Sequence, residues 1–263
     1  MHLWHLTSLD APTVAVVWTL AFAWAVRLLL PMWLPAVLAL AAWSAYIGDR
    51  LLDARSARTP LRARHLFHWK HRRIFLPLAV AAAVTGLTLI LRSMPVAARG
   101  RNSLLAAAAL VYFTSVHSPW RATRSTLRLP KELFVGIIFT VVCVTPTWAR
   151  IPGQRLSLVL PILVFTALAW LNCHAIETWE SQGGRKSGAI FRLAAILAAL
   201  ASLSALVEAS QYDFHQSALL TAAALSAGLL AVLDNRRQAM TAVTLRAAAD
   251  LVLLVPAALL AIR

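Results

Sequence analysis

Charged residues are scarce in this sequence, and acidic residues most of all. Of 263 residues only 10 are Asp or Glu, charged residues make up 13% of the chain, and hydrophobic residues make up 60%. Soluble domains carry about 25% charged residues, and a chain of this length could not bury so much apolar surface in water. The composition excludes an ordinary soluble globular protein and indicates an integral membrane protein.

Cysteine is also rare, since the chain holds only Cys143 and Cys173, both inside apolar stretches. This excludes a disulfide-stabilised secreted scaffold. The N-terminal MHLWHLTSLDAPT has no Lys or Arg before the first apolar run and no small-residue cleavage site after it, so we expect no cleaved signal peptide. Strand-like alternation, internal repeats and low-complexity tracts are absent from the sequence, which predicts one all-helical domain over residues 1–263.

What the sequence does contain is a series of apolar runs long enough to cross a bilayer, which takes about 20 residues per helix. They are rich in Ala and Leu, as helices prefer. Nine such runs predict an all-α bundle of about nine transmembrane helices. The predicted spans cover residues 12–29, 31–53, 74–92, 102–118, 132–149, 156–180, 188–208, 215–234 and 243–262.

The net charge of +15 is distributed unevenly among the connections. Of the 25 Lys and Arg, 18 lie in or beside the second, fourth, sixth and eighth connections, and the seventh has none. By the positive-inside rule the N-terminus is inside and the C-terminus outside, in a bacterial-type cytoplasmic (inner) membrane. This placement favours lipid headgroups or an anionic substrate over nucleic acid, and lipid attraction alone explains most of the scattered arginines.

Two aspartates end the second predicted span. Asp49 and Asp53 are four residues apart, so on a helix their Cβ atoms lie about 6 Å apart on one face. Near the negative end of a helix dipole, such a pair is unfavourable unless a cation accompanies it. Arg50 and Arg55 could supply that charge as ordinary ion pairs. A Mg²⁺ ion held by one or two carboxylates and substrate phosphates could supply it too.

A basic stretch follows these aspartates. Arg and Lys are the usual partners of phosphate oxygens, so the stretch favours anion binding. The same segment contains His65, His68 and His71, but no acidic or thiolate companion that a transition-metal site would use. The residues predicted to contact phosphate here are Arg62, Arg64 and Lys70.

A second polar cluster ends the sixth predicted span. Asn172, Ile176 and Glu180 follow one another at steps of four, with Glu177 beside them. Polar groups at such a depth face the bundle interior or water. They predict either a second metal-binding face or a polar helix end that pairs with nearby arginines. Elsewhere, Asp250 lies four residues after Arg246, which predicts a simple ion pair within one helix.

The fourth connection adds bases that could close on a diphosphate from the side opposite Asp49 and Asp53. They precede and begin the segment LPKELFVGIIF, in which Gly136 lies. The residues predicted to contribute are Arg121, Arg124 and Lys131.

Together these features resemble the UbiA superfamily of intramembrane prenyltransferases, and the architecture matches over nearly the whole chain. The family's first motif is an Asn followed at steps of four by aspartates; Asp49 and Asp53 match it, and Ala45 replaces the Asn. Its second motif is acidic at similar steps; here the central position is Ile176, with Glu177 as a substitute. The family's Tyr and basic segment looks like Tyr112 with Lys131 and Arg121 or Arg124.

The resemblance implies a Mg²⁺-dependent enzyme that transfers a polyprenyl group from a prenyl diphosphate to a lipid-soluble, often aromatic, acceptor. Metal and basic side chains would stabilise the departing diphosphate. Aromatic side chains near the rim could shield the allylic cation or simply anchor the protein at the interface. The implied metal-binding and catalytic residues are Asp49, Asp53, Asn172, Glu177 and Glu180, and the aromatic candidates are Trp43, Tyr46, Tyr112, Trp170 and Trp179.

Two alternatives stay open. A terpene cyclase or synthase on the same scaffold would use the same ionisation without a separate acceptor. A transporter or non-catalytic membrane protein is the alternative of a different class. Transporters usually carry internal repeats and polar groups at mid-membrane, whereas here the polar groups collect at one rim, which favours an enzyme.

Overall fold

The computed structural model describes residues 2–56, 63–100, 102–104, 107, 131–181, 188–211 and 213–262. Within these residues every regular element is a helix, and there is no strand. The predicted all-α class is therefore confirmed for the described part of the chain.

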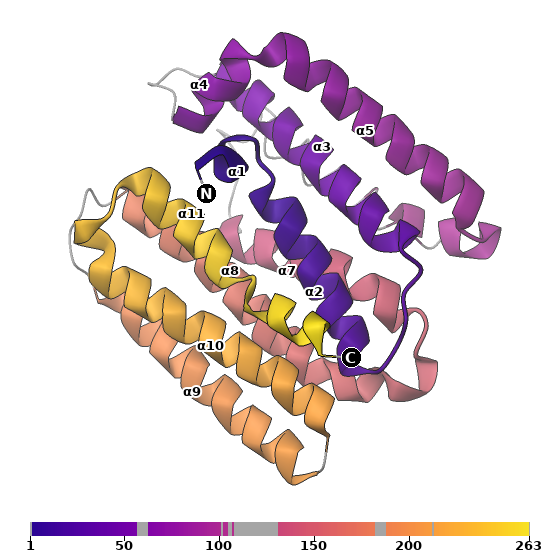
Figure 1. Cartoon of the computed structure of the whole chain (residues 1–263), viewed down its shortest axis with the longest axis vertical. Coiled ribbons are helices and arrows are strands. Elements are labelled where there is room, and N and C mark those ends of the chain that lie inside the picture. The colour runs from indigo at the N-terminus through magenta and orange to yellow at the C-terminus, as the bar shows by residue number, and fades with distance from the viewer. Residues whose placement is uncertain are drawn as a thin grey trace, which may run out of the picture. The chain divides into compact units, whose positions relative to one another are not determined.

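The described elements follow one another along the chain as a series of helices (Figure 1). The α-helices are α1 (His2–Leu6), α2 (Asp10–Ala25), α3 (Trp33–Ser56), α4 (Ala63–Lys70), α5 (Arg72–Ser93), α7 (Lys131–Trp148), α8 (Val159–Ser181), α9 (Ala189–Ser210), α10 (Phe214–Arg236) and α11 (Ala242–Val252). The 3₁₀ segments are η2 (Pro152–Leu158), η3 (Arg237–Ala239) and η4 (Val255–Ala261).

Five of these helical stretches are long and apolar enough to cross a membrane, and they indicate an integral membrane protein. They are Arg72–Ser93, Pro152–Glu180, Ala189–Ser210, Phe214–Ala239 and Ala242–Ala261. α2 and α7 are apolar but shorter. The fourth predicted span, 102–118, lies mostly outside the described residues, so the count of nine stays a prediction.

The chain divides into two compact units, which are described separately below. Unit 1 comprises Met1–His2, Thr13–Pro31 and Pro130–Arg263. Unit 2 comprises Leu3–Pro12 and Met32–Leu129. The two acidic motifs fall in different units: Asp49 and Asp53 belong to unit 2, and Asn172 and Glu180 to unit 1.

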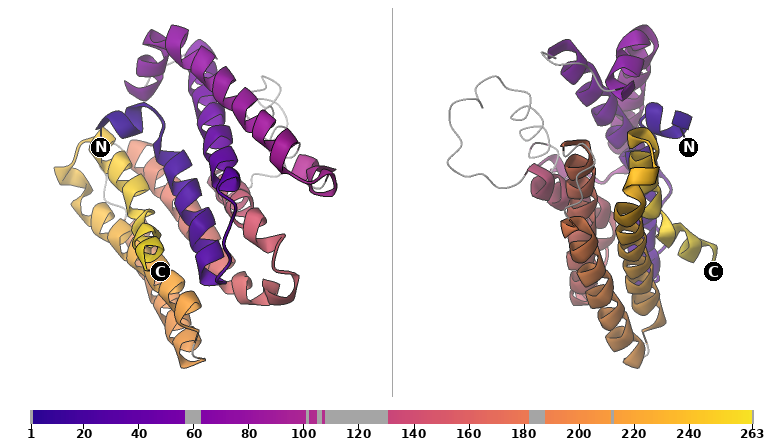
Figure 2. Two further views of the ribbon diagram at one scale, coloured as in Figure 1. Left: turned by 45° about the vertical axis from the view of Figure 1, so that its right-hand side comes forward. Right: turned by 90° about the vertical axis from the view of Figure 1, so that its left-hand side faces the viewer.

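Unit 2 is built on the antiparallel pair of α3 and α5 (Figure 2). α5 buries Phe75, Ala79 and Ala82 at helical spacing, so that one face packs while the others remain apolar and exposed. Ile47 of α3 packs against Phe75 and Ala79. This packing fixes the last turns of α3, which carry the two aspartates.

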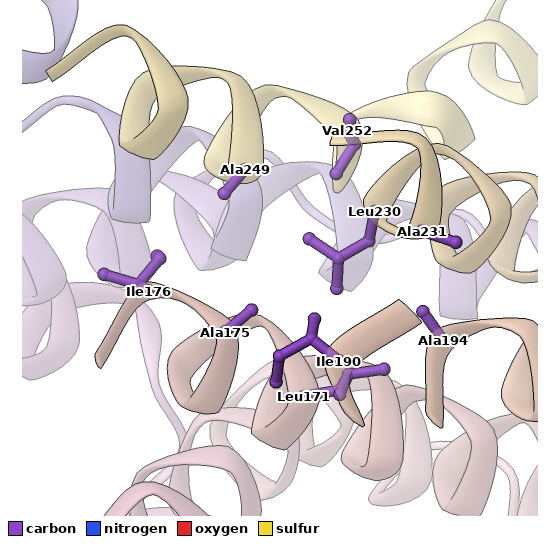
Figure 3. Packing of buried hydrophobic residues seen from close by; sticks show 9 residues of the cluster. All are labelled: Leu171, Ala175, Ile176, Ile190, Ala194, Leu230, Ala231, Ala249 and Val252. Atoms are coloured by element: carbon purple, nitrogen blue, oxygen red, sulfur yellow. The ribbon is translucent and has the colours of Figure 1, made fainter. Parts of the chain in front are cut away.

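Unit 1 contains a core shared by four helices (Figure 3). Its buried members are Leu171, Ala175 and Ile176 of α8, Ile190 and Ala194 of α9, Leu230 and Ala231 of α10, and Ala249 and Val252 of α11. α9 and α10 lie side by side (Figures 1 and 2). α9 turns Ala194, Ala201 and Ala205 inward, as membrane helices do when small residues allow close packing. Most of its leucines are exposed, namely Leu193, Leu200, Leu203 and Leu206.

Gly136 lies at a close approach of α7 to α8. A Cβ atom at this position would lie 2.8 Å from the backbone N of Trp170 and 3.0 Å from its Cα. Because backbone atoms cannot swing aside, the Gly136→Ala change is expected to separate the two helices and to lower the free energy of unfolding by about 1–3 kcal/mol. Thermal unfolding of the detergent-solubilised protein measures this loss.

The matched control is Gly228→Ala in α10, where an added Cβ would meet nothing within 4 Å. Alanine is the better helix former, so this variant should unfold at or above the wild-type temperature. Equal midpoints for Gly136→Ala and the wild type would contradict the close α7–α8 contact.

Candidate active site

The first acidic motif lies in the last turns of α3. Asp49 Oδ2 accepts a hydrogen bond from Arg50 Nη1 at 2.7 Å, and the Asp49 side chain is 32% exposed. Asp53 Oδ2 lies 3.5 Å from His65 Nε2, and the Asp53 side chain is 47% exposed. Both carboxylates are therefore accessible from outside the unit, and each has a cationic or titratable neighbour.

Arg50 is the buried cation of this cluster. Its side chain is 6% exposed, and its guanidinium lies over the Tyr46 ring at 5.4 Å. Among the described residues, its Nε has no hydrogen-bond partner. Of the two arginines that the sequence offered as counter-charges, Arg50 bonds to Asp49, whereas Arg55 is exposed. Charge compensation of Asp49 by a protein group is thus present, and both carboxylates are partly exposed.

The histidines that follow are packed into unit 2. His68 is fully buried, and its ring lies 4.5 Å from that of Phe75. Burial lowers the pKa of His68 to about 4, and the charge of Arg50 acts in the same direction. His68 is therefore neutral near pH 7 and does not add positive charge for a phosphate.

The basic residues predicted to contact phosphate are only partly covered by the structure. Lys70 is exposed at the end of α4, and Arg64 belongs to the same helix. Lys131 is the first residue of α7. Arg62, Tyr112, Arg121 and Arg124 lie outside the described residues.

The second motif lies on α8 in unit 1, and its members point in different directions. Asn172 is buried, Ile176 is part of the apolar core, and Glu177 is exposed. Glu180 is largely buried, with its side chain 17% exposed. Residues at steps of four share a face of an α-helix, whereas the next residue is rotated by about 100°. This geometry explains why Glu177 turns away from the face that carries Asn172 and Glu180.

That face of α8 meets α11. Glu180 Oε1 accepts a hydrogen bond from Arg246 Nη1 at 2.8 Å, and Asn172 Nδ2 donates to Asp250 Oδ1 at 3.3 Å. The sequence predicted that Arg246 and Asp250 would pair with each other. In the structure each of them has a partner on α8, so two polar residues of α8 are matched by two of α11.

Asp234 is a polar centre that the sequence analysis missed. Its Oδ1 accepts from Trp179 Nε1 at 2.8 Å and from Arg237 Nη1 at 2.9 Å, and its Oδ2 accepts from the backbone N of Phe191 at 3.1 Å. Asp234 and Arg237 also line a cavity of about 230 Å³ together with Gly188, Phe191 and Asn235. The sequence signal that could have identified Asp234 is its position as a single acidic residue at the end of the apolar run 215–234.

The aromatic residues near the rim have structural partners in the described part of the chain. Trp43 Nε1 donates to the carbonyl of Thr7 at 2.9 Å, and Trp179 donates to Asp234. Trp170 stacks on His174 with ring centroids 5.7 Å apart. These contacts show that the three tryptophans have packing roles. Tyr46 lies beneath the guanidinium of Arg50.

No family model, curated protein or solved structure matches this chain. The resemblance to the UbiA superfamily therefore stays an expectation from the residues and motifs quoted above.

Proposed function

We propose that this protein is a Mg²⁺-dependent intramembrane prenyltransferase, which transfers a polyprenyl group from a prenyl diphosphate to a lipid-soluble acceptor. The observation that carries the proposal is the pair of accessible carboxylates, Asp49 and Asp53, one turn apart beside the buried Arg50. Like charges at this spacing destabilise a helix, and a bound metal ion would offset the repulsion between the two carboxylates together with Arg50.

The first motif fits a Mg²⁺ ion. Carboxylate oxygens are the ligands that Mg²⁺ takes from proteins, usually one or two of them with water and substrate phosphates completing the shell. Asp49 and Asp53 are 32% and 47% exposed, so a hydrated ion and a diphosphate have access to both. When bound, the ion would neutralise charge that grows on the leaving diphosphate.

The second motif fits a metal less directly. Glu180 is bonded to Arg246, Glu177 is exposed, and Ile176 has no ligand atom. Of the residues proposed for this half of the site, Asn172 and Glu180 remain the ones on the interior face of α8.

The remaining groups supply binding and orientation. The exposed Lys70 would contact the diphosphate, with Arg62, Arg64, Arg121, Arg124, Lys131 and Tyr112 as the other proposed contributors. The apolar helices would bind the prenyl chain, because this chain is itself apolar and partitions into the lipid phase. We place the site at the cytosolic face of an inner membrane, with the N-terminus inside, because the basic connections collect there.

The test is to incubate the purified protein in lipid nanodiscs with labelled prenyl diphosphates of several chain lengths, Mg²⁺ and a membrane lipid extract, and to analyse the products by chromatography. Labelled lipid conjugates that require Mg²⁺ would support a transferase. Labelled hydrocarbons or alcohols without an acceptor would indicate the terpene cyclase or synthase instead. Absence of both turnover and Mg²⁺-dependent diphosphate binding would overturn the proposal and favour a transporter or non-catalytic protein.

A further inference from the structure

The junction between α4 and α5 in unit 2 carries a cluster of exposed basic side chains. Only His71 separates the two helices (Figure 1), and Lys70, Arg72 and Arg73 around it are all exposed. Within the described residues, no carboxylate forms an ion pair with any of these three cations. The described part of the protein therefore leaves this positive charge uncompensated.

The position of the two arginines in α5 adds to the positive potential. Arg72 and Arg73 are the first two residues of α5, whose first turn contains no acidic residue. His71, the N-cap residue, makes no side-chain capping hydrogen bond. The N-terminus of a helix carries a partial positive charge and N–H groups without partners in the helix. Two cations are unfavourable there unless an anion accompanies them.

Trp69 holds Arg72 in a fixed position at this junction. Arg72 Nη1 donates to the carbonyl of Trp69 at 2.9 Å, and the guanidinium carbon lies 4.8 Å from the centre of the indole ring. A guanidinium that is already held in place loses less side-chain entropy when it binds an anion. The carbonyl accounts for one N–H of Arg72. Within the described residues, Arg73 makes no side-chain hydrogen bond.

The same face of α5 continues as an apolar track. Arg72 is the first residue of the candidate membrane-spanning stretch Arg72–Ser93, so its side chain lies where the hydrocarbon core meets the headgroups. Leu76, Val80 and Val84 follow Arg72 at steps of four, which share a helix face, and all three are exposed. Tryptophan is enriched at the same level of a bilayer. The anion that a membrane places at this depth is the phosphate of a lipid.

A second pair of an arginine and a tryptophan, in unit 1, has a different setting. Arg155 lies over the ring of Trp148 at 5.6 Å and donates from Nε to its carbonyl at 3.3 Å. Arg150 Nη1 donates to another carbonyl in the last turn of α7 at 2.8 Å. The C-terminus of a helix carries a partial negative charge that favours cations. Helix geometry therefore accounts for Arg150 and Arg155 without a ligand.

We propose that Arg72 and Arg73, with Trp69, form a binding site for the headgroup of an anionic phospholipid at the start of α5. The two guanidiniums bind the phosphate oxygens, as arginine does by its planar fork of donors, and the N-terminus of α5 adds its attraction for the negative charge. The acyl chains lie along Leu76, Val80 and Val84. This site goes beyond the proposed function and does not depend on it.

The test is native mass spectrometry of the purified, delipidated full-length protein in detergent, which resolves the binding of single lipids. Titration with phosphatidylglycerol or phosphatidylcholine of the same acyl chains gives a dissociation constant for each. We expect phosphatidylglycerol to bind the wild type more tightly. The double change Arg72→Gln, Arg73→Gln should raise its dissociation constant about 30-fold, or about fivefold per arginine, the attraction of one Arg to an anionic lipid surface. The constant for phosphatidylcholine should not change.

The matched control is the double change Arg150→Gln, Arg155→Gln, which removes the same charge beside Trp148. It should leave the dissociation constant for phosphatidylglycerol unchanged. Because Arg72 and Arg73 are exposed, their double variant should unfold near the wild-type temperature, which separates loss of lipid binding from loss of the fold.

Equal binding of the two lipids by the wild type, or an equal loss in the two double variants, would overturn this inference. Titration with inorganic diphosphate distinguishes a lipid headgroup from a soluble anion. Tighter binding of diphosphate than of phosphatidylglycerol would assign the cluster to a soluble anion and would also overturn the inference. None of these readouts depends on prenyl transfer, so their outcome leaves the proposed function to its own test.

Discussion

The Asp49→Asn change is expected to reduce the rate of prenyl transfer by about 10²- to 10³-fold. A loss of this size is typical when one preorganised charge-stabilising group is removed from an active site. The amide keeps the size of the side chain but loses the charge that would hold Mg²⁺ beside the diphosphate. Asp53→Asn should act in the same direction. The rate is measured as labelled lipid product per protein at saturating prenyl diphosphate.

A structural effect of this change must be separated from a catalytic one, because Asp49 also bonds to Arg50 at 2.7 Å. The Asp49 side chain is 32% exposed, so loss of this bond should cost little stability, as exposed ion pairs contribute about 0–1 kcal/mol. The unfolding temperature of Asp49→Asn should stay near that of the wild type, and the Mg²⁺ concentration needed for half-maximal rate should rise. Glu208→Gln, which removes a carboxylate near the end of α9, is the matched control. Full activity of Asp49→Asn at wild-type Mg²⁺ dependence would rule out a metal at the first motif.

Removal of the Asp234 carboxylate should have the largest effect on stability. Asp234 and Arg237 are 4% and 5% exposed in their side chains, and Asp234 also accepts from Trp179 and from the backbone of Phe191. The Asp234→Ala change would remove one acceptor from a buried guanidinium, one from an indole N–H and one from a backbone N–H. Breaking a buried ion pair in this way costs about 3–5 kcal/mol, and it should loosen the ends of α8, α9 and α10 together.

The measurement is unfolding in a graded series of denaturing detergent, followed by tryptophan fluorescence, which also reports the surroundings of Trp179. The matched control is Asp213→Asn at the start of α10. Asp213 caps that helix by accepting from the backbone N of Gln216 at 3.1 Å, and Asn caps a helix about as well as Asp. If Asp234→Ala and Asp213→Asn lowered the free energy of unfolding equally, the contacts of Asp234 would not contribute the expected extra stability.

The candidate site shows where local reasoning from the sequence succeeds. The steps of four from Asn172 to Glu180 predicted a shared face that points to the interior or to water, and the structure has Asn172 buried and Glu180 largely buried. The counter-charge for Asp49 was limited to neighbours in the sequence or a metal, and Arg50 is one of those neighbours. Such features depend on helix geometry over one or two turns, so the sequence is sufficient for them.

Contacts between residues far apart in the sequence could not be predicted in this way. Asp250 was expected to pair with Arg246 in its own helix, and its contact with Asn172, 78 residues away, was not foreseen. Asp234 attracted no prediction, although it joins Trp179, 55 residues away, to the N-terminal turn of α9. Neither contact follows from a local pattern, because each depends on which helices pack together and on their register.

The sequence by itself determined that this protein is helical and apolar enough for a membrane, because hydropathy and the length of a span are properties of a continuous segment. It also determined which polar residues share a helix face. Only the tertiary structure decided that Glu180 bonds to Arg246, that Asn172 meets Asp250, and that Gly136 lies against the backbone of Trp170. The physical reason is that these contacts arise where helices distant in the sequence cross, and the choice of neighbours is set by the packing of the whole unit.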